Sequence, residues 1–125
     1  MEQKFYKCEH CGNIIAIVKS TGVPVMCCGQ KMTEIVPNTV EASGEKHIPV
    51  WRIEGSKVHV NVGSIAHPML DEHYIEWVSI QTRFGNQRKQ LLPGQNPEVC
   101  FSICEGDVIE AVYAYCNLHG LWISK

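Results

Sequence analysis

The stretch Lys57-Val58-His59-Val60-Asn61-Val62 alternates polar and apolar residues along its whole length. Successive side chains of an extended strand point to opposite faces, so this pattern is typical of a β-strand with one buried and one solvated face. The three valines would then face a core, and His59 would lie on the solvated face with its polar neighbours. The stretch therefore predicts a sheet that is packed on one side only.

The sequence on both sides of this stretch has the same texture. Short apolar segments rich in β-branched and aromatic residues are separated by turn sequences such as Glu54-Gly55-Ser56 and Glu105-Gly106-Asp107. No segment keeps a helical period. The expected strands are Val50–Ile53, Lys57–Val62, Tyr74–Thr82, Arg88–Leu91, Val99–Cys104 and Val108–Tyr115. Six or seven short strands at this spacing predict a mainly β fold, an antiparallel β-sandwich of the immunoglobulin-like kind.

The beginning of the chain is organised differently, around four cysteines. Cys8 and Cys11 are two residues apart, and after fifteen further residues Cys27 and Cys28 are adjacent. A glycine follows the second and the fourth cysteine, where it lets backbone amides turn toward the sulfurs. Four thiolates in so short a segment suit a tetrahedral metal site. The alternatives are a strained disulfide between the adjacent cysteines, or inert buried thiols.

The spacing of these cysteines also bears on the metal and on the domain boundary. Zinc knuckles present two spaced pairs, and the missing spacer here slightly favours iron over zinc. Ile14–Val18 and Val23–Met26 are expected as short strands beside the metal, which would hold this small unit together. Pro37-Asn38 marks a break. We therefore expect a metal-binding domain at residues 1–36 and a β-sandwich domain at residues 37–125.

A second group of possible metal ligands lies near the end of the chain, in Cys116-Asn117-Leu118-His119-Gly120. A thiolate and an imidazole three residues apart can bind one metal ion, but they cannot complete its coordination alone. His47, His67 and His73 fall in loops or at strand ends, where binding residues gather. Taken singly, each would more often be an ordinary surface histidine. Together they predict a site of imidazoles and one thiolate, which suits iron, copper or zinc.

Copper is the weakest of these three choices. A blue-copper site on a β-sandwich also has a histidine shortly after its cysteine, but its pattern continues to an axial methionine. Gly120-Leu121-Trp122 follows here without one. The remaining cysteines, Cys100 and Cys104, are four residues apart in an expected strand and are interpreted as small core residues. His10 and His59 are interpreted as exposed.

Composition excludes several classes of function. The formal net charge of the 125 residues is -2, with dispersed Lys and Arg, so nothing indicates binding to nucleic acid or to an acidic membrane. The N-terminus has no signal-peptide run, and a bilayer span needs about 20 apolar residues, far more than Ile14–Val18 offers. Seven cysteines, an odd number, point to metal binding in a reducing compartment. We expect a soluble cytoplasmic protein.

These motifs together resemble one known family, desulfoferrodoxin, the two-centre form of superoxide reductase. The resemblance covers essentially the whole chain, with several independent motifs in the same order. They are Tyr6-Lys7-Cys8-x-x-Cys11-Gly12-Asn13, Cys27-Cys28-Gly29-Gln30, Glu45-Lys46-His47-Ile48-Pro49-Val50, Gly63-Ser64-Ile65-Ala66-His67-Pro68-Met69, His73-Tyr74-Ile75-Glu76-Trp77 and Cys116-Asn117-Leu118-His119-Gly120. Every ligand position of the family is filled, and the departures, near residues 82–90 and at Cys100 and Cys104, involve no ligand.

The resemblance implies two iron centres. A desulforedoxin-like N-terminal domain would hold one iron in four thiolates, those of Cys8, Cys11, Cys27 and Cys28. An immunoglobulin-like domain would hold the second iron in a plane of four imidazoles, with an axial thiolate and an open position opposite it in the ferrous state. These ligands would be His47, His67, His73, His119 and Cys116. Members of the family are typically homodimers.

The activity implied is the one-electron reduction of superoxide to hydrogen peroxide, with electrons from a donor such as a rubredoxin. Neutral imidazoles leave a ferrous centre net positive even with one thiolate, which favours an anionic ligand, and the trans thiolate donates electron density along the axis. Lys46 would attract superoxide and orient a water that delivers a proton. Glu45 would bind the ferric iron once product has left. Composition alone would make these two residues a solvated loop pair.

Two other functions are compatible with the residues. One is a non-enzymatic electron-transfer protein with two iron centres, which would form no rapid intermediate with superoxide. The other is a zinc-ribbon binding module on a β-sandwich, with incidental histidines. Zinc alone at both sites would exclude both iron proteins.

Overall fold

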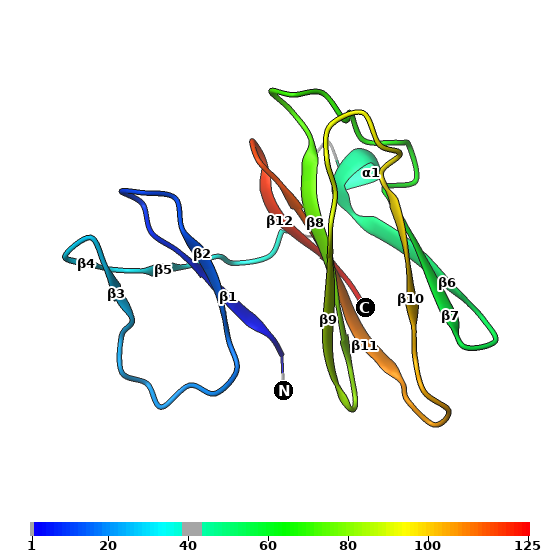
Figure 1. The fold of residues 1–125 in the computed structure, drawn as a ribbon, viewed down its shortest axis with the longest axis horizontal. Coiled ribbons are helices and arrows are strands. Elements are labelled where there is room, and N and C mark those ends of the chain that lie inside the picture. Colours follow the sequence, from blue (N-terminus) through cyan, green and yellow to red (C-terminus); the bar gives the residue numbers. More distant parts are fainter. Residues whose placement is uncertain (1, 39–43) are drawn as a thin grey trace. The chain divides into compact units, whose positions relative to one another are not determined.

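The computed structural model describes residues 2–38 and 44–125, and its regular structure is almost entirely β, which confirms the predicted fold class (Figure 1). The chain divides into two compact units, Met1–Val36 and Pro37–Lys125. In the described part of the chain, α1 (Gly44–His47) is a single helical turn. No helix there has the length and hydropathy needed to cross a membrane.

The first unit consists of short antiparallel strands. β1 (Lys4–Lys7) lies between β2 (Ile14–Ile17) and β5 (Thr33–Glu34), and β3 (Met26–Cys27) pairs with β4 (Gln30–Lys31). The strand expected at residues 14–18 is therefore present. The strand expected at residues 23–26 is wrong except for its last residue, and the proline inside that stretch has no N–H to give to a ladder.

This unit buries little apolar surface. Of its described apolar side chains, Phe5 and Cys8 are buried. Val18, Val23 and Val36 are 97%, 74% and 75% exposed, so the larger apolar residues that the unit contains do not form a core. Hydrophobic burial on this scale cannot offset the conformational entropy of ordering the unit, and a further crosslink is required.

The second unit is a sandwich of two antiparallel sheets (Figure 1). One sheet has the strand order β10-β7-β6, and the other has the order β12-β11-β8-β9. The strands are β6 (Pro49–Glu54), β7 (Lys57–Val62), β8 (Ile75–Thr82), β9 (Gly85–Gln90), β10 (Glu98–Ser102), β11 (Ile109–Cys116) and β12 (Gly120–Ser124). All six expected strands are present with their ends shifted by at most three residues, and β12 was not predicted.

The core lies between these sheets, as the alternation in β7 predicts. Val58, Val60 and Val62 of that strand have no exposed surface. They pack with residues of the facing sheet and its neighbours in one continuous cluster that includes Ile75, Val78, Ile80, Leu91, Phe101, Val112, Ala114 and Cys116. The sulfur of Cys116 is therefore anchored in the packed interior of the sandwich.

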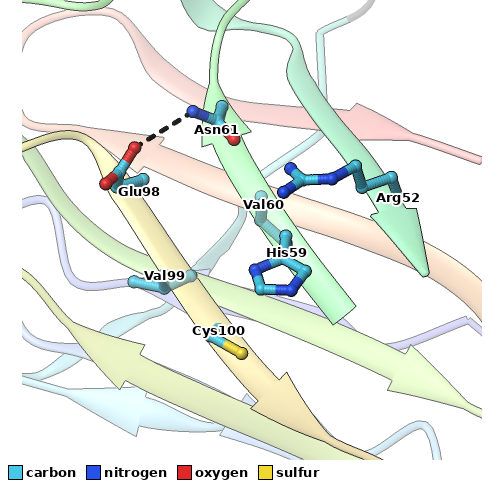
Figure 2. A pocket seen from close by; sticks show the side chains of 7 residues that line it. All are labelled: Arg52, His59, Val60, Asn61, Glu98, Val99 and Cys100. Carbon is cyan, nitrogen blue, oxygen red and sulfur yellow. Dashed lines mark hydrogen bonds between the residues drawn. The ribbon is translucent and has the colours of Figure 1, made fainter. Parts of the chain in front are cut away.

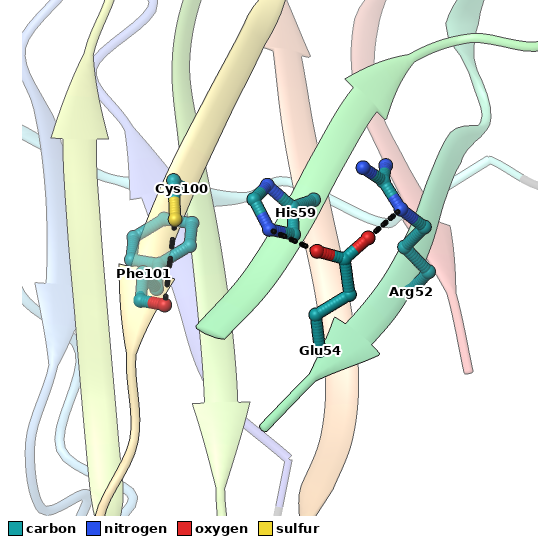
Figure 3. A network of polar contacts seen from close by, with 5 residues as sticks. All are labelled: Arg52, Glu54, His59, Cys100 and Phe101. Atoms are coloured by element: carbon teal, nitrogen blue, oxygen red, sulfur yellow. Dashed lines mark hydrogen bonds and ion pairs between the residues drawn. The ribbon is translucent and has the colours of Figure 1, made fainter. Parts of the chain in front are cut away.

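The outer face of the β10-β7-β6 sheet is polar, and a pocket of about 480 Å³ lies on it (Figure 2). Arg52, His59 and Cys100 are cross-strand neighbours there. Glu54 pairs with Arg52 at 3.1 Å and lies 3.6 Å from the Nε2 atom of His59 (Figure 3). His59 is thus a surface residue, as predicted. The interpretation of Cys100 and Cys104 as core residues is wrong, because Cys100 is half-buried on this outer face and Cys104 is exposed after the strand ends.

Gly63 allows α1 to approach the segment that follows β7. A Cβ atom at Gly63 would lie 2.6 Å from the backbone oxygen of Glu45, closer than real contacts allow. The same oxygen accepts hydrogen bonds from the N–H of Ile65 at 2.9 Å and from the hydroxyl of Ser64 at 3.2 Å. Glycine at position 63 therefore allows the turn that ends at His47 to pack closely against the segment after β7.

Replacing Gly63 with alanine should lower the free energy of unfolding of the sandwich by about 2 kcal/mol, because backbone atoms must move to admit the new methyl group. Gly44→Ala in the same turn is the matched control, since its Cβ would meet the flexible end of Ile48 at 3.2 Å, which can shift. Urea denaturation followed by tryptophan fluorescence measures both. Equal costs for the two variants would contradict the close-approach role of Gly63.

Candidate metal centres

The four cysteines of the first unit converge on one point. The Sγ atoms of Cys8, Cys11, Cys27 and Cys28 all lie within 4.8 Å of one another. The sulfurs of Cys11 and Cys27 are 3.7 Å apart. Four sulfurs placed tetrahedrally at about 2.3 Å from one metal ion are about 3.8 Å apart, so the spacing fits a single ion.

Two turns with left-handed residues bring these sulfurs together. Gly12 has a φ of 85° and closes the turn after Cys8-Glu9-His10-Cys11, in which the N–H of Cys11 lies 3.5 Å from the sulfur of Cys8. Cys28 and Gly29 have φ values of 51° and 73° and form the two-residue connection between β3 and β4. Two positive φ values in such a connection are the mark of a type I′ hairpin turn. This turn explains why the second pair of cysteines has no spacer.

The four thiols do not ionise equally. The backbone N–H of Cys11 stabilises the thiolate of Cys8 and lowers the pKa of Cys8 to about 6. Hydrogen bonds to the sulfurs of Cys11 and Cys8 hold the proton on Cys28 and raise its pKa to about 12. A hydrogen bond to Cys8 likewise raises the pKa of Cys27. The Cys8 thiolate forms readily, whereas the thiolates of Cys27 and Cys28 are costly, so a bound cation is needed to stabilise the set as ligands.

A second cluster lies at one end of the sandwich. The donor atoms of His47, His67, His73 and Cys116 all lie within 4.8 Å of one another. The Nε2 atom of His47 is 3.2 Å from Nε2 of His67 and 3.2 Å from Nδ1 of His119, which is itself 3.8 Å from the Cys116 sulfur. Imidazole nitrogens at about 2.1 Å from one metal ion lie about 3.0–3.4 Å apart for angles between square and tetrahedral. The cluster therefore has the dimensions of one metal site.

The imidazole of His67 is prepared as a neutral ligand. Burial lowers the pKa of His67 to about 4, so its ring carries no charge at neutral pH. Its Nδ1 donates a hydrogen bond to the backbone oxygen of Pro68 at 2.7 Å, which directs the Nε2 lone pair into the cluster. The Nε2 atom of His73 is buried and has no hydrogen-bond partner in the part of the chain that the structure describes. A metal ion would satisfy this orphaned nitrogen.

Burial favours the protonated form of the Cys116 thiol, which is not the form that binds a metal ion. Burial raises its pKa, while the backbone N–H groups of His119 and Leu118 hydrogen-bond to the sulfur and lower it. The side chain has no exposed surface. A thiolate at this position therefore depends on positive charge beside it, which a metal ion would supply.

Trp122 on β12 supports two of the clustered histidines, and sequence reasoning missed it. Its ring stacks on that of His47, with centroids 4.6 Å apart and planes 19° apart. Its Nε1–H donates to the backbone oxygen of His119 at 3.2 Å. The tryptophan itself is fully buried. The signal was an aromatic residue in an apolar run directly after the Cys-x-x-His motif, but that run was not recognised as a strand.

The structure brings eight of the nine ligand candidates into two groups whose donor atoms lie within 4.8 Å of one another. The ninth, His119, adjoins the second group through its Nδ1 atom, which is 3.2 Å from Nε2 of His47 and 3.8 Å from the Cys116 sulfur. The rings of His47 and His67 are buried, whereas His119 lies at the solvent-exposed edge of its cluster. Glu45 and Lys46 stand on α1 with exposed side chains, immediately before a clustered histidine. Their side-chain atoms are not among the converging donor atoms that the structure describes.

Comparison with protein families gives two matches, which together cover almost the whole sequence. The model described as "Desulfoferrodoxin" matches residues 39–125. The model described as "Desulfoferrodoxin, N-terminal domain" matches residues 1–35.

Individual proteins agree with these matches. A desulfoferrodoxin homolog of Archaeoglobus fulgidus is 45% identical over 119 residues, covering 95% of this chain and 94% of that protein. A superoxide reductase of Pyrococcus abyssi is 34% identical over 99 residues, covering 63% of this chain and 84% of that protein. The crystal structure of the superoxide reductase from Treponema pallidum is similar with a TM-score of 0.84 and 37% identity, covering 99% of this chain and 98% of that one.

Removing metal from the protein with a strong chelator should unfold the first unit and leave the sandwich folded, because among the described residues only those of the sandwich form a continuous apolar core. Amide hydrogen exchange should show loss of protection in β1 and β2, with protection retained in β8 and β11. Re-addition of ferrous iron is the control and should restore β1 and β2. Persistent protection of β2 in protein shown to be free of metal would contradict the prediction.

Proposed function

The chain belongs to the desulfoferrodoxin family, and on this premise we propose how its residues reduce superoxide. Its two clusters fit the two iron centres of desulfoferrodoxin. The chain is a superoxide reductase, an oxidoreductase in which superoxide, one electron and two protons give hydrogen peroxide, without dismutation. The observation that carries this function is the convergence of four imidazoles and one buried thiol at the end of a packed sandwich.

The assignment of ligands and domains is part of this proposal. Residues 1–36 would form a desulforedoxin-like domain with one iron held by Cys8, Cys11, Cys27 and Cys28. Residues 37–125 would form the catalytic domain with iron held by His47, His67, His73, His119 and Cys116. The assignment is supported by the two compact units and by the position of each cluster within one of them.

When bound, ferrous iron would supply the electron and a place where a small anion can bind. The protein sets the charge around that position. Neutral imidazoles such as that of His67 add no charge, and Cys116 adds one negative charge as the thiolate, so the site stays net positive toward superoxide. The amides that hydrogen-bond to the Cys116 sulfur moderate how much electron density it donates.

Glu45 and Lys46 act at the exposed edge of this site in our proposal. The ammonium group of Lys46 attracts superoxide and orients a water that delivers protons to the product. The carboxylate of Glu45 would serve as a further anionic ligand for the oxidised iron. The seating of α1 against Gly63 supports these roles, because it holds both residues in the turn that carries His47.

We also propose an electron donor such as a rubredoxin, a homodimeric state and a cytoplasmic location. Leu118 lies between two ligands and is 60% exposed, which offers a donor an apolar contact beside the thiolate. The exposed valines of the first unit support association of two subunits. The unpaired cysteines support a reducing compartment.

Sedimentation velocity with and without rubredoxin tests the assembly, and a monomeric chain would exclude the dimer.

Replacing Cys116 with serine should lower the second-order rate constant for superoxide more than 100-fold, because the thiolate that would hold the iron is lost, while the visible absorbance of the four-cysteine centre is retained. Pulse radiolysis measures the reaction. Cys100→Ser is the matched control, since Cys100 lies on the outer face of the sandwich, and its rate should be unchanged. Full activity in the Cys116 variant would refute a superoxide reductase that works through this thiolate.

Replacing Lys46 with alanine should slow the reaction with superoxide about tenfold at low ionic strength, and less at high salt, because screening removes the attraction between ammonium and anion. The same pulse-radiolysis experiment over a range of salt concentrations measures both effects. Lys57→Ala is the control, because this exposed lysine donates a hydrogen bond to Ser102 in the β10-β7-β6 sheet. A Lys46 variant with the salt dependence of the unaltered protein would exclude the steering role.

A further inference from the structure

The side chain of Asn117 hydrogen-bonds to the backbone on both sides of His73, one of the proposed ligands. Its Oδ1 atom accepts a hydrogen bond from the N–H of Tyr74 at 3.0 Å, and its Nδ2 group donates to the backbone oxygen of Glu72 at 3.0 Å. The N–H of Asn117 itself donates to the backbone oxygen of Tyr74 at 3.2 Å. These partners stand on the two sides of His73, 44 residues earlier in the chain.

Asn117 also stands beside a ligand of its own segment. It follows Cys116 directly, at the point where β11 ends. Its three hydrogen bonds therefore join the backbone that presents the Cys116 sulfur to the backbone that presents the His73 ring.

His73 has few other restraints on its position. Its backbone N–H and oxygen exchange hydrogen bonds with Leu70, which closes a local turn and leaves neither group to tie that turn to the sandwich. Its described ring contacts are edge contacts with other histidines, His67 at 4.7 Å and His119 at 5.0 Å. By contrast, His47 stacks on a buried tryptophan. The placement of the His73 ring therefore depends on what holds its turn.

An amide is the side chain that this position requires. The N–H of Tyr74 needs an acceptor and the backbone oxygen of Glu72 needs a donor, and an asparagine side chain offers both. An aspartate would keep the bond to Tyr74 but would place a carboxylate oxygen against the oxygen of Glu72. Alanine would lose both bonds.

We propose that Asn117 is a positioning residue for the His/Cys centre, which fixes the Nε2 atom of His73 relative to the sulfur of Cys116. The proposal rests on the ligand assignment above and deepens it. Without the amide, the turn that carries His73 loses two of the hydrogen bonds that attach it to the end of β11 and keeps the backbone bond between Asn117 and Tyr74, so the imidazole is held less precisely. Partners that orient a ligand from outside the coordination shell typically change metal affinity 10- to 100-fold when they are removed.

The test compares the affinity of the His/Cys centre for ferrous iron in Asn117→Ala, Asn117→Asp and the unaltered chain, by competition with a chromophoric chelator. We expect affinity to fall about 10- to 100-fold in Asn117→Ala and by less in Asn117→Asp, which keeps one of the two side-chain bonds. The visible absorption of the ferric, thiolate-ligated centre should shift in parallel. Iron at the four-cysteine centre is an internal reference and should be unchanged.

Asn61→Ala is the matched control, because the side chain of Asn61 donates to Glu98 at 3.2 Å on the outer face of the same unit (Figure 2). Its iron affinity should equal that of the unaltered chain. A double-mutant cycle with His73→Ala separates positioning from general destabilisation: the Asn117 substitution should have no further effect on affinity once His73 is absent.

The outcomes are distinct. If Asn117→Ala does not fold, Asn117→Asp and its cycle with His73→Ala carry the test in its place. Unchanged affinity and spectrum in the folded Asn117 variants, or an equal effect in the background without His73, would overturn the positioning role while leaving the proposed function intact. An unaltered chain that binds no metal at the His/Cys cluster would overturn the ligand assignment, and the role of Asn117 with it.

Discussion

The second unit depends on one electrostatic constraint, the burial of a thiol sulfur beside the uncharged imidazole of His67. Burial raises the pKa of Cys116, and burial keeps His67 uncharged, so neither group supplies the charge that the other lacks. A positive ion is the one partner that makes the thiolate favourable and also fills the orphaned nitrogen of His73. The sandwich provides a rigid frame for this arrangement because Cys116 belongs to the same packed cluster as the valines of β7.

The two metal clusters are related to their units in different ways. In the first unit, the described apolar interior is limited to Phe5 and Cys8, and the sulfur cluster takes the role that a hydrophobic core has in a larger domain. In the second unit, the donors stand at the end of a core that is already complete. An ion in the first unit therefore contributes mainly to folding, whereas an ion in the second is held by a structure that can form around the empty donor set. This difference matches a structural role for one centre and a chemical role for the other.

The sequence predicted those parts of the structure that depend on local pattern. The alternation from Lys57 to Val62 identified a half-buried strand, and it is present with the same bounds. The end of the chain was not predicted, because Gly120–Ser124 is too short and too uniformly apolar to show a period. Cys100 was misplaced for a related reason: four-residue spacing gives the face of a strand, but it does not say which face meets the core.

The histidine cluster lay beyond what spacing could establish. His47, His67 and His73 converge with Cys116 only because the sheet that contains β6 and β7 packs on the sheet in which β8 and β11 are neighbours. Sequence separation contains no record of that arrangement. The positions of these histidines in loops and at strand ends predicted a shared site, resemblance to a family specified its ligands, and the distances now give the site a physical basis. The contributions of Trp122 and Asn117 are of the same kind, since both act through contacts between segments far apart in the chain.

The hairpin between β11 and β12 has a further consequence for how this protein can vary. Cys116 pairs with Gly120, whose φ is 81°, so three residues form the connection and a ligand stands in it. An insertion or deletion of one residue there would displace His119, shift the pairing of β12 and turn Trp122 to the opposite face of its sheet. The connection between β8 and β9 contains no candidate metal ligand. Insertions and deletions should therefore be tolerated better in the hairpin between β8 and β9 than in the hairpin between β11 and β12.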